Sequence, residues 1–431
     1  MFLTLLIYIV LVIVRPQEYM DALAGLDLPR YVLLFAFVLW TLKSPKLMSA
    51  PQQWLVPVFC GLAILSRAAL GWLGGVFLAL QELVPLIMLF YVCASVAEDR
   101  KSLTRVLQVI CLAALVLVAH GINEILTDGK SWTGYEMDIY PDGHRIQYIG
   151  QFYDPNDLAM LFAACFPMAL YLSWETAGKL IKLFWWGAAG MLAYGVFLTN
   201  SRGGLLAIVA TAGLWSTRRL GNVATGIIAA IFLPSLFAAT RLAALSADEE
   251  SAAGRVDAWY TALQLFISRP FTGVGMGLFT EHNTLTAHNS WLLVLAEIGF
   301  VGYVAWFSLV AFSLQQMYVV GHYVAPVAAS SGADSRGGGA GDRGEQPLAL
   351  VMFYVSVGLL VSAFFLSRSY MFLFFMYWGL CAGVYNGARD RRPGVPRVGA
   401  KEFAGRWSIA AVVSIPVFYL LIRILLAVDH E

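Results

Sequence analysis

Apolar segments long enough to cross a lipid bilayer recur along the whole chain. Thirteen of them are bounded by charged residues, proline or glycine, at 2–14, 28–42, 53–72, 76–96, 104–125, 156–174, 181–199, 203–217, 221–240, 288–320, 347–366, 370–388 and 407–427. A helix needs roughly 20 predominantly apolar residues to span the hydrocarbon core, so the first segment is marginal in length. The pattern predicts an all-α, polytopic membrane protein with about 12–13 transmembrane helices.

The basic residues orient these helices. Seventeen of the 28 lysines and arginines fall in alternate loops, at Lys43, Lys46, Arg100, Lys101, Arg105, Lys179, Lys182, Arg218, Arg219, Arg336, Arg343, Arg389, Arg391, Arg392, Arg397, Lys401 and Arg406. Cytoplasmic loops of membrane proteins carry an excess of lysine and arginine. We therefore expect the N-terminus inside the cell and the C-terminus outside.

Composition agrees with this interpretation. Charged residues make up 13% of the chain against roughly 25% in soluble proteins, and mean hydropathy is +0.72. These values exclude a soluble enzyme, a nucleic-acid-binding protein and a secreted disulfide scaffold. The five cysteines lie in apolar segments without a CxxC pair, which favours free core residues. The net charge of +1 does not indicate a partner.

The long loops set the expected domain organisation. Residues 1–324 would form ten helices with two long outer loops, 126–155 and 241–287, and residues 347–431 would form the C-terminal helices. Both outer loops mix charges with aromatic residues, so we expect them to fold against the membrane face. Residues 325–346 read as a flexible cytoplasmic linker. Candidate chemistry is therefore expected on the outer face.

One outer turn has the composition of an anion site. Thr199–Gly204 (TNSRGG) joins two predicted helices, and Asn200 or Ser201 can cap the second of them. A helix N-terminus beside Arg202 suits phosphate or carboxylate, and two glycines allow close backbone approach. The same residues are also explained by an ordinary helix cap followed by an arginine whose charged group extends to the membrane interface.

Other polar residues within or beside apolar segments allow a structural explanation. Arg67 and Glu82 fall at similar depth and fit an ion pair, and Glu297 fits a pair within the helix bundle. His288 opens the tenth segment, where a helix dipole favours its neutral, proton-accepting form.

The loop residues are less informative. The first outer loop carries Asp138, Asp142, His144 and Arg145, which exposure to solvent explains. GVGMG at 273–277 is predicted to be a turn, because the dinucleotide-binding motif that its glycines suggest would need a preceding strand and none is predicted. No HExxH or dense His and carboxylate cluster indicates a metal site.

Several motifs occur in an order that we recognise. SRGG at 201–204, GRVDAW at 254–259, RPFTGVGMGLF at 269–279 and HNSWLLVLAEIGFVG at 288–302 follow QFYDPNDLA at 151–159. Together they resemble the bacterial O-antigen ligase and Wzy-type polysaccharide polymerase superfamily. The family usually has Asn where Asp154 stands, so that part of the likeness is incomplete.

The resemblance implies a GT-C-like fold of about a dozen transmembrane helices with a periplasmic loop domain. It implies a multi-pass protein of the bacterial inner membrane that takes a glycan from an undecaprenyl-pyrophosphate donor, without cofactor, metal or nucleotide sugar. Arg202 and Arg255 would hold the pyrophosphate, and His288 would be the catalytic base. Further candidates are Ser201, Asn156, Asn289, Arg145 and Arg241. Two arginine forks at a helix N-terminus would stabilise the charge that develops on the leaving pyrophosphate.

Three functions stay open. A polymerase of O-antigen or exopolysaccharide is favoured, because the loop from Arg241 to His288 is short for gripping lipid A core and a thirteenth span puts the C-terminus outside. A ligase that attaches the glycan to lipid A core or protein is the close alternative. A transporter of lipid-linked glycans is the third, although transporters usually place polar sites near the midplane in repeated halves. Single displacement predicts inversion at the donor carbon.

Overall fold

A computed structural model gives the fold. It describes residues 1–127, 129–134, 145–242, 247–323 and 345–429, with the side chains of 228–242, 247–253 and 428–429 outside the described part. The described residues contain thirteen α-helices: α1 (Phe2–Ile13), α2 (Leu28–Leu42), α3 (Gln52–Ala68), α4 (Leu73–Val96), α5 (Arg100–Leu126), α6 (Pro155–Glu175), α7 (Lys179–Leu198), α8 (Arg202–Leu242), α9 (Ala247–Ser268), α10 (Ser290–His322), α11 (Gln346–Ala363), α12 (Phe372–Arg391) and α13 (Ser408–Asp429). Short helical turns lie at Pro16–Glu18, Asp21–Leu23, Gly150–Phe152, Phe279–Glu281 and Glu402–Trp407.

The expected all-α, polytopic membrane class is confirmed, while the expected number of about 12–13 transmembrane helices stays a prediction. Within the described part of the chain, seven helical segments are long and apolar enough to cross a membrane, six of them being α4, α5, α6, α7, α10 and α11, and the seventh Glu402–Ala427, most of which is α13. α1 and α2 are apolar but shorter. The segments predicted at 203–217 and 221–240 fall in α8, where Gly221 (φ 83°, ψ 167°) breaks the helical backbone between them. The protein is thus an all-helical, multi-pass membrane protein.

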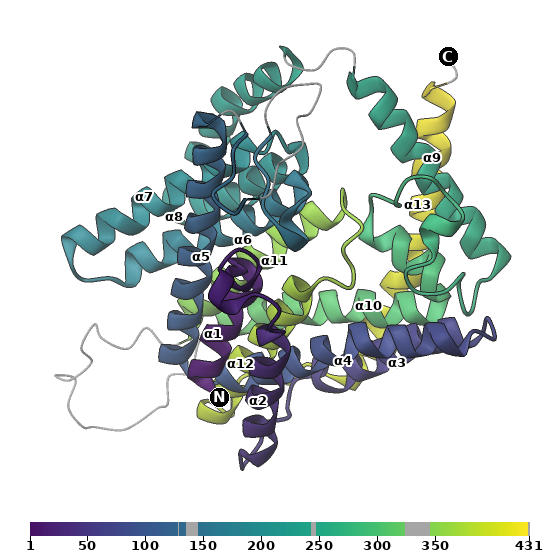
Figure 1. Cartoon of the computed structure of the whole chain (residues 1–431), viewed down its shortest axis with the longest axis horizontal. Helices are drawn as coiled ribbons and strands as arrows, with labels where there is room; N and C mark the ends of the chain where they lie inside the picture. The colour runs from purple at the N-terminus through teal and green to yellow at the C-terminus, as the bar shows by residue number, and fades with distance from the viewer. Residues whose placement is uncertain (128, 135–144, 243–246, 324–344, 430–431) are drawn as a thin grey trace.

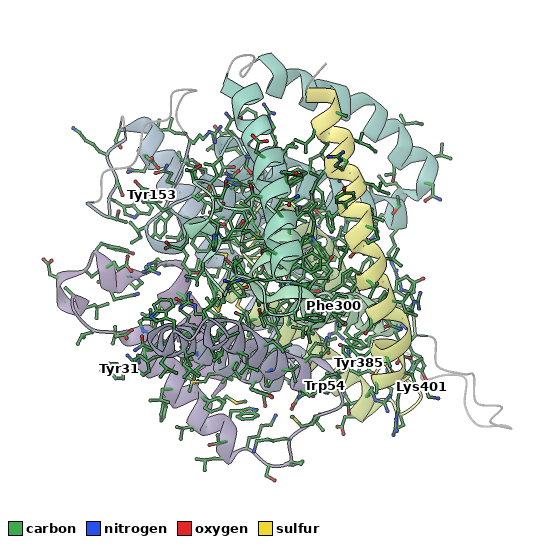
Figure 2. All side chains as sticks on the ribbon, turned by 90° about the vertical axis from the view of Figure 1, so that its right-hand side faces the viewer. Tyr31, Trp54, Tyr153, Phe300, Tyr385 and Lys401 are labelled. Atoms are coloured by element: carbon green, nitrogen blue, oxygen red, sulfur yellow. The ribbon has the colours of Figure 1, made fainter. Side chains whose placement is uncertain are left out.

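α6 forms the centre of the bundle. In its most apolar window 89% of the residues are buried, against 11% for the segment Glu402–Ala427 at the periphery. α6 packs against α7, α8 and α11, while α10 packs against α3, α9 and α11. In Figure 1, α7 and α8 lie on one side and α9 and α13 on the other. Figure 2 shows side chains filling the space between the helices.

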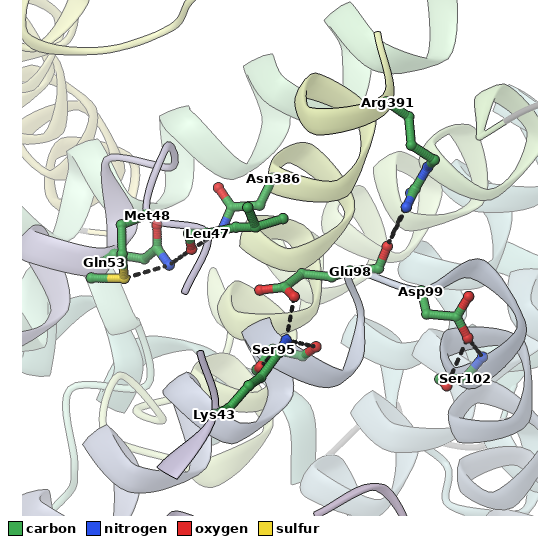
Figure 3. Close-up of polar contacts among 10 residues, drawn as sticks. All are labelled: Lys43, Leu47, Met48, Gln53, Ser95, Glu98, Asp99, Ser102, Asn386 and Arg391. Carbon is green, nitrogen blue, oxygen red and sulfur yellow. Dashed lines mark hydrogen bonds and ion pairs between the residues drawn. The ribbon is translucent and has the colours of Figure 1, made fainter. Parts of the chain in front are cut away.

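The loops that were assigned to one side meet at one end of the bundle. Lys43, which follows α2, donates to Ser95 Oγ at 2.7 Å and pairs with Glu98 between α4 and α5 (Figure 3). Arg391, at the end of α12, donates to the Glu98 carbonyl at 2.9 Å and pairs with Glu345 at 2.6 Å. These contacts join the segments after α2, after α4, before α11 and at the end of α12, all of which were predicted to lie on the same side of the membrane. Their meeting supports the predicted alternation of the helices.

α10 is broken, which the sequence interpretation missed. Gly299 has φ 74° and ψ −169°, and the segment 269–277 packs into the break. The Phe300 N–H donates to the Pro270 carbonyl at 2.7 Å, while the N–H groups of Val274 and Gly275 donate to the carbonyls of Ala296 and Glu297, each at 2.9 Å. The interpretation of 273–277 as a turn is confirmed, since the Leu278 N–H donates to the Gly275 carbonyl at 3.1 Å, but the sequence did not indicate that this turn packs into a broken helix. This loop supplies hydrogen bonds that the interrupted helix no longer makes.

The expected pair of Arg67 with Glu82 is also wrong for the described residues. Arg67 is 5% exposed and donates to the carbonyls of Met276 at 2.6 Å and Gly75 at 3.2 Å. Glu82 is exposed on α4. Arg67 thus fastens the 269–277 loop to α3 and α4. Glu297 is buried and accepts the Phe279 N–H at 3.2 Å, so it contributes to the same support.

The described portions of the loops are as follows. In the first outer loop, Ile146, Tyr148 and Phe152 are buried, so its described portion packs against the rest of the protein, while folding against the membrane face stays a prediction. The second outer loop contains α9. All five cysteines are buried and free. Residues 325–344 of the predicted linker, and Asp138, Asp142 and His144, lie outside the described residues.

Candidate functional site

Three helix N-termini meet at one end of the bundle. Asp154 caps α6 by accepting the Asn156 N–H at 2.8 Å, and Ser201 caps α8 by accepting the Gly204 N–H at 3.3 Å. Asn289 caps α10 by accepting the N–H groups of Trp291 and Leu292 at 2.9 and 3.1 Å. The Ser201 hydroxyl donates to Asn156 Oδ1 at 2.7 Å, which joins the first two helix ends. Their dipoles make the region favourable for an anion.

Arg368 connects the α6 and α10 ends, and the sequence interpretation did not single it out. Its Nε lies 2.7 and 2.8 Å from the two carboxylate oxygens of Asp157, and its Nη2 lies 2.6 Å from Oδ2. Its backbone N–H donates to Ser290 Oγ at 3.0 Å. The Asp157 carboxylate raises the pKa of Arg368, despite partial burial. The available signal was a single arginine in the short segment 366–370, between two apolar segments on the predicted outer side.

Arg202 and Arg255 are brought to this end as expected. Arg202 is the first residue of α8, and Arg255 lies on α9 and is half-buried. Burial lowers the pKa of Arg255, and the positive charges of Arg202 and Arg145 lower it further, while Asp154 opposes them. Among the described residues, four guanidinium groups, including that of Arg368, lie with the carboxylates of Asp154 and Asp157. The region is therefore cationic, although its groups repel one another, and an anionic ligand would relieve that repulsion.

His288 faces the same charges but does not open the helix. It is half-buried, has φ 44° and precedes the Asn289 cap, because the capping hydrogen bonds fix the start of α10 at Ser290. Burial lowers the pKa of His288 below its ordinary value, and the cations Arg255 and Arg368 lower it further against Asp154. The imidazole is therefore neutral at pH 7 and able to accept a proton.

The secondary candidates have different surroundings. Asn156 and Ser201 hydrogen-bond to each other, and Arg145 interacts electrostatically with Arg255. Asn289 is buried, and its Nδ2 has no hydrogen-bond partner among the described residues. The side chain of Arg241 lies outside the described part of the chain. Four of the five candidates thus have a described position at this end of the bundle.

The two glycines after Arg202 serve helix packing. A Cβ on Gly204 would lie 2.7 Å from Ala159 Cβ on α6, and one on Gly203 would lie 3.3 Å from the Phe365 side chain. The expectation that they also allow a ligand close to the backbone stays a prediction. They allow α8 to approach α6 and the end of α11, which positions Arg202.

An apolar groove of about 450 Å³ opens beside the charged region. It lies between α10, α11 and α13 and is lined by Trp291, Phe307, Leu360, Val361, Phe364, Phe365, Ser414 and Phe418. Phe364 also packs edge-on against Trp259 of α9, with ring centroids 5.6 Å apart. The site therefore combines a cationic, hydrogen-bonding region with an adjoining apolar surface. Such a combination suits an amphiphilic anion.

Comparison with known families agrees with this chemistry. Residues 187–307 match the sequence model of a family described as O-antigen ligase, and this range contains Arg202, Arg255 and His288. Asp154, Asn156 and Arg368 lie outside it. No curated protein matches the chain. The match confirms, over this part of the chain, the resemblance to the O-antigen ligase and Wzy-type polymerase superfamily that the motifs indicated.

Proposed function

We propose that the protein transfers a glycan from an undecaprenyl-pyrophosphate donor to an acceptor hydroxyl at the periplasmic face of the bacterial inner membrane. The observation that carries this proposal is the meeting of Arg202, Arg255 and Arg368 with a half-buried neutral His288. A diphosphate carries the charge that such a cluster would stabilise. A neutral imidazole beside it supplies the base that a hydroxyl acceptor needs.

The proposed reaction is a single displacement that requires no metal or cofactor. The acceptor oxygen attacks the donor's anomeric carbon, and the bond from that carbon to the diphosphate oxygen breaks. The electron pair leaves with the diphosphate, whose growing charge Arg202 and Arg255 stabilise. The acceptor proton passes to a ring nitrogen of His288. Attack opposite the leaving group inverts the configuration at the anomeric carbon.

The apolar groove supports a lipid-linked donor. It adjoins the charged region through Phe365, whose side chain contacts Gly203, the residue after Arg202. We propose that the first isoprene units of the donor lie along this groove while the diphosphate lies among the arginines. Ser201 and Asn156 would orient the helix end, and Asn289, whose buried Nδ2 has no hydrogen-bond partner among the described residues, would donate a hydrogen bond to the substrate. Arg145 would add positive charge beside Arg255.

Between the two acceptor classes we favour a second lipid-linked glycan, which makes the enzyme a polymerase of O-antigen or exopolysaccharide. The connection between α8 and His288 consists of α9 and a loop that packs against α10, with little chain left to form a separate acceptor domain. Transfer to lipid A core is the second candidate, favoured by the description of the matching family as O-antigen ligase.

The test uses purified protein in liposomes with a lipid-linked oligosaccharide donor and a chelator. Products are separated by size for wild type, His288→Ala and Arg255→Ala. A ladder with the spacing of one repeat is expected for wild type. Loss of His288 is expected to slow turnover by about 100- to 10,000-fold, and loss of Arg255 by about 100- to 1000-fold. A product of retained anomeric configuration would contradict single displacement.

Matched controls are available in the same segment. His282 and Arg269 are exposed and belong to no described contact with the site, so His282→Ala and Arg269→Ala should keep wild-type rates. A single product that forms only with lipid A core would replace the polymerase by the ligase. Donor translocation without any new glycosidic bond, equally impaired in His288→Ala and Arg255→Ala, would show transport and overturn the enzymatic proposal.

A further inference from the structure

A second cationic cavity lies at the opposite ends of the helices that form the site. It encloses about 300 Å³ between the C-terminal part of α6, the middle of α8 and the start of α11. Its walls carry Trp174, Trp215, Arg218, Arg219 and Tyr354. Polar and apolar groups line it together, unlike the apolar groove beside the site.

The cavity carries a net positive charge. The Arg219 guanidinium lies 3.9 Å from the centroid of the Trp174 ring, a cation–π contact that fixes its position. Arg218 and Arg219 both lie near Tyr354 in the lining of the cavity. The carboxylate in the lining, Glu175, is paired with Arg100 at 2.6 Å. Among the described lining residues, the two adjacent arginines therefore face the cavity with Glu175 as the one carboxylate, already paired with Arg100.

The helices place this cavity at the level of a membrane interface. Sixteen residues of α8 separate Arg202 from Arg218, which at 1.5 Å per residue is about 24 Å along the helix axis. That length approaches the roughly 30 Å thickness of a hydrocarbon core. Tryptophans such as Trp174 and Trp215 are typical of the interface, where lipid phosphates lie.

We propose that this cavity binds a phosphate group, carried either by an anionic phospholipid or by a soluble phosphate compound. Arg218 and Arg219 offer planar donors that match phosphate oxygens, and Tyr354 adds a hydroxyl donor. The indole rings would contact the glycerol or sugar portion next to the phosphate. This proposal is independent of the transferase reaction, because none of these residues belongs to the site at the other end of the bundle.

The test measures lipid binding by native mass spectrometry of the detergent-purified full chain. Dioleoylphosphatidylglycerol is titrated against dioleoylphosphatidylcholine for wild type, Arg218→Gln/Arg219→Gln and Arg397→Gln, whose target is an exposed arginine of another loop. A basic side chain near an anionic surface contributes a factor of about five, so the double variant should bind phosphatidylglycerol about 30-fold more weakly. Arg397→Gln should match wild type.

The two phosphate sources give different results. Displacement of bound phosphatidylglycerol by millimolar inorganic phosphate or ATP, lost in the double variant, would assign the cavity to a soluble phosphate compound. Resistance to displacement, with the same dependence on the two arginines, would assign it to a lipid. If the double variant does not fold, each single variant should show a loss of about five-fold. Wild-type affinity for all of these probes in the arginine variants would overturn the proposal.

Discussion

The pair formed by Arg368 and Asp157 gives the sharpest test of how the site is assembled. Asp157 has a side chain that is 1% exposed, whereas the side chain of Arg368 is 36% exposed. Replacing Arg368 with glutamine leaves a buried carboxylate without its cation. Replacing Asp157 with asparagine leaves an arginine that can still reach solvent. We therefore expect Arg368→Gln to destabilise the protein more than Asp157→Asn.

The magnitude follows from burial. Removing one partner of a fully buried ion pair costs about 3–5 kcal/mol. Solvent reaches Arg368, so we reduce this to about 2–3 kcal/mol for Arg368→Gln. Asp157→Asn keeps a hydrogen-bond acceptor for the guanidinium and should cost about 1 kcal/mol. Because the two side chains contact each other, the double variant should lose less unfolding free energy than the sum of the two single losses.

The assay is a double-mutant cycle on unfolding in mixed micelles. We expect a coupling free energy of about 2 kcal/mol, of the size found for residues in direct contact. The exposed pair of Asp27 with Arg30 provides a control, with 57% and 74% exposed side chains and an expected coupling below about 0.5 kcal/mol. Coupling as small for Arg368 and Asp157 as for this control would refute the reasoning.

Three further predictions concern His288, Gly299 and Ser201. Turnover should fall as the pH is lowered, with an apparent pKa below 6.5, because burial and the charge of Arg255 keep His288 neutral. Arg255→Gln should raise that apparent pKa. A pH–rate profile of each protein measures both effects. Gly299→Ala should destabilise the protein by more than about 3 kcal/mol in thermal unfolding, because Gly299 has a positive φ and an added Cβ would lie 2.6 Å from the Phe271 backbone carbon. Gly187→Ala on α7 is the control. Its added Cβ meets no atom within 4 Å, so this variant should be tolerated. Ser201→Ala should cost about 1 kcal/mol through loss of the α8 cap and of the bond to Asn156, and unchanged unfolding would contradict that role.

The helices were predictable from sequence because a bilayer imposes a simple pattern. The segment predicted at 28–42 coincides with α2, and most others differ from the structure by a few residues at their ends. The candidate residues Arg202, Arg255 and His288 were found because each stands beside an apolar segment or within a recognisable motif. Their side chains meet at one end of the bundle as expected.

Contacts between distant segments were not predictable in the same way. Arg368 is 211 residues from Asp157, and only the packing of α6 beside α11 reveals that they pair. The break at Gly299 depends on a loop about 25 residues earlier in the chain, so the continuous apolar pattern across 288–320 concealed it. Arg67 was assigned to the nearest carboxylate in sequence, whereas its true acceptors include the carbonyl of Met276.

The matched family segment therefore contains two kinds of residue with different physical roles. Arg202, Arg255 and His288 carry the charge and the proton acceptor, whereas Gly273 and Gly299 allow the loop and the broken helix to approach each other. A Cβ at Gly273 would lie 2.3 Å from the Glu297 backbone, so this approach requires glycine. The break shortens the first part of α10 to nine residues, about 14 Å, between the Asn289 cap and Gly299. This short first part of α10 is held at its N-terminus by the Asn289 cap and at its C-terminus by the 269–277 loop. His288, which directly precedes the cap, is therefore held rigidly, as a base that must meet a substrate proton requires.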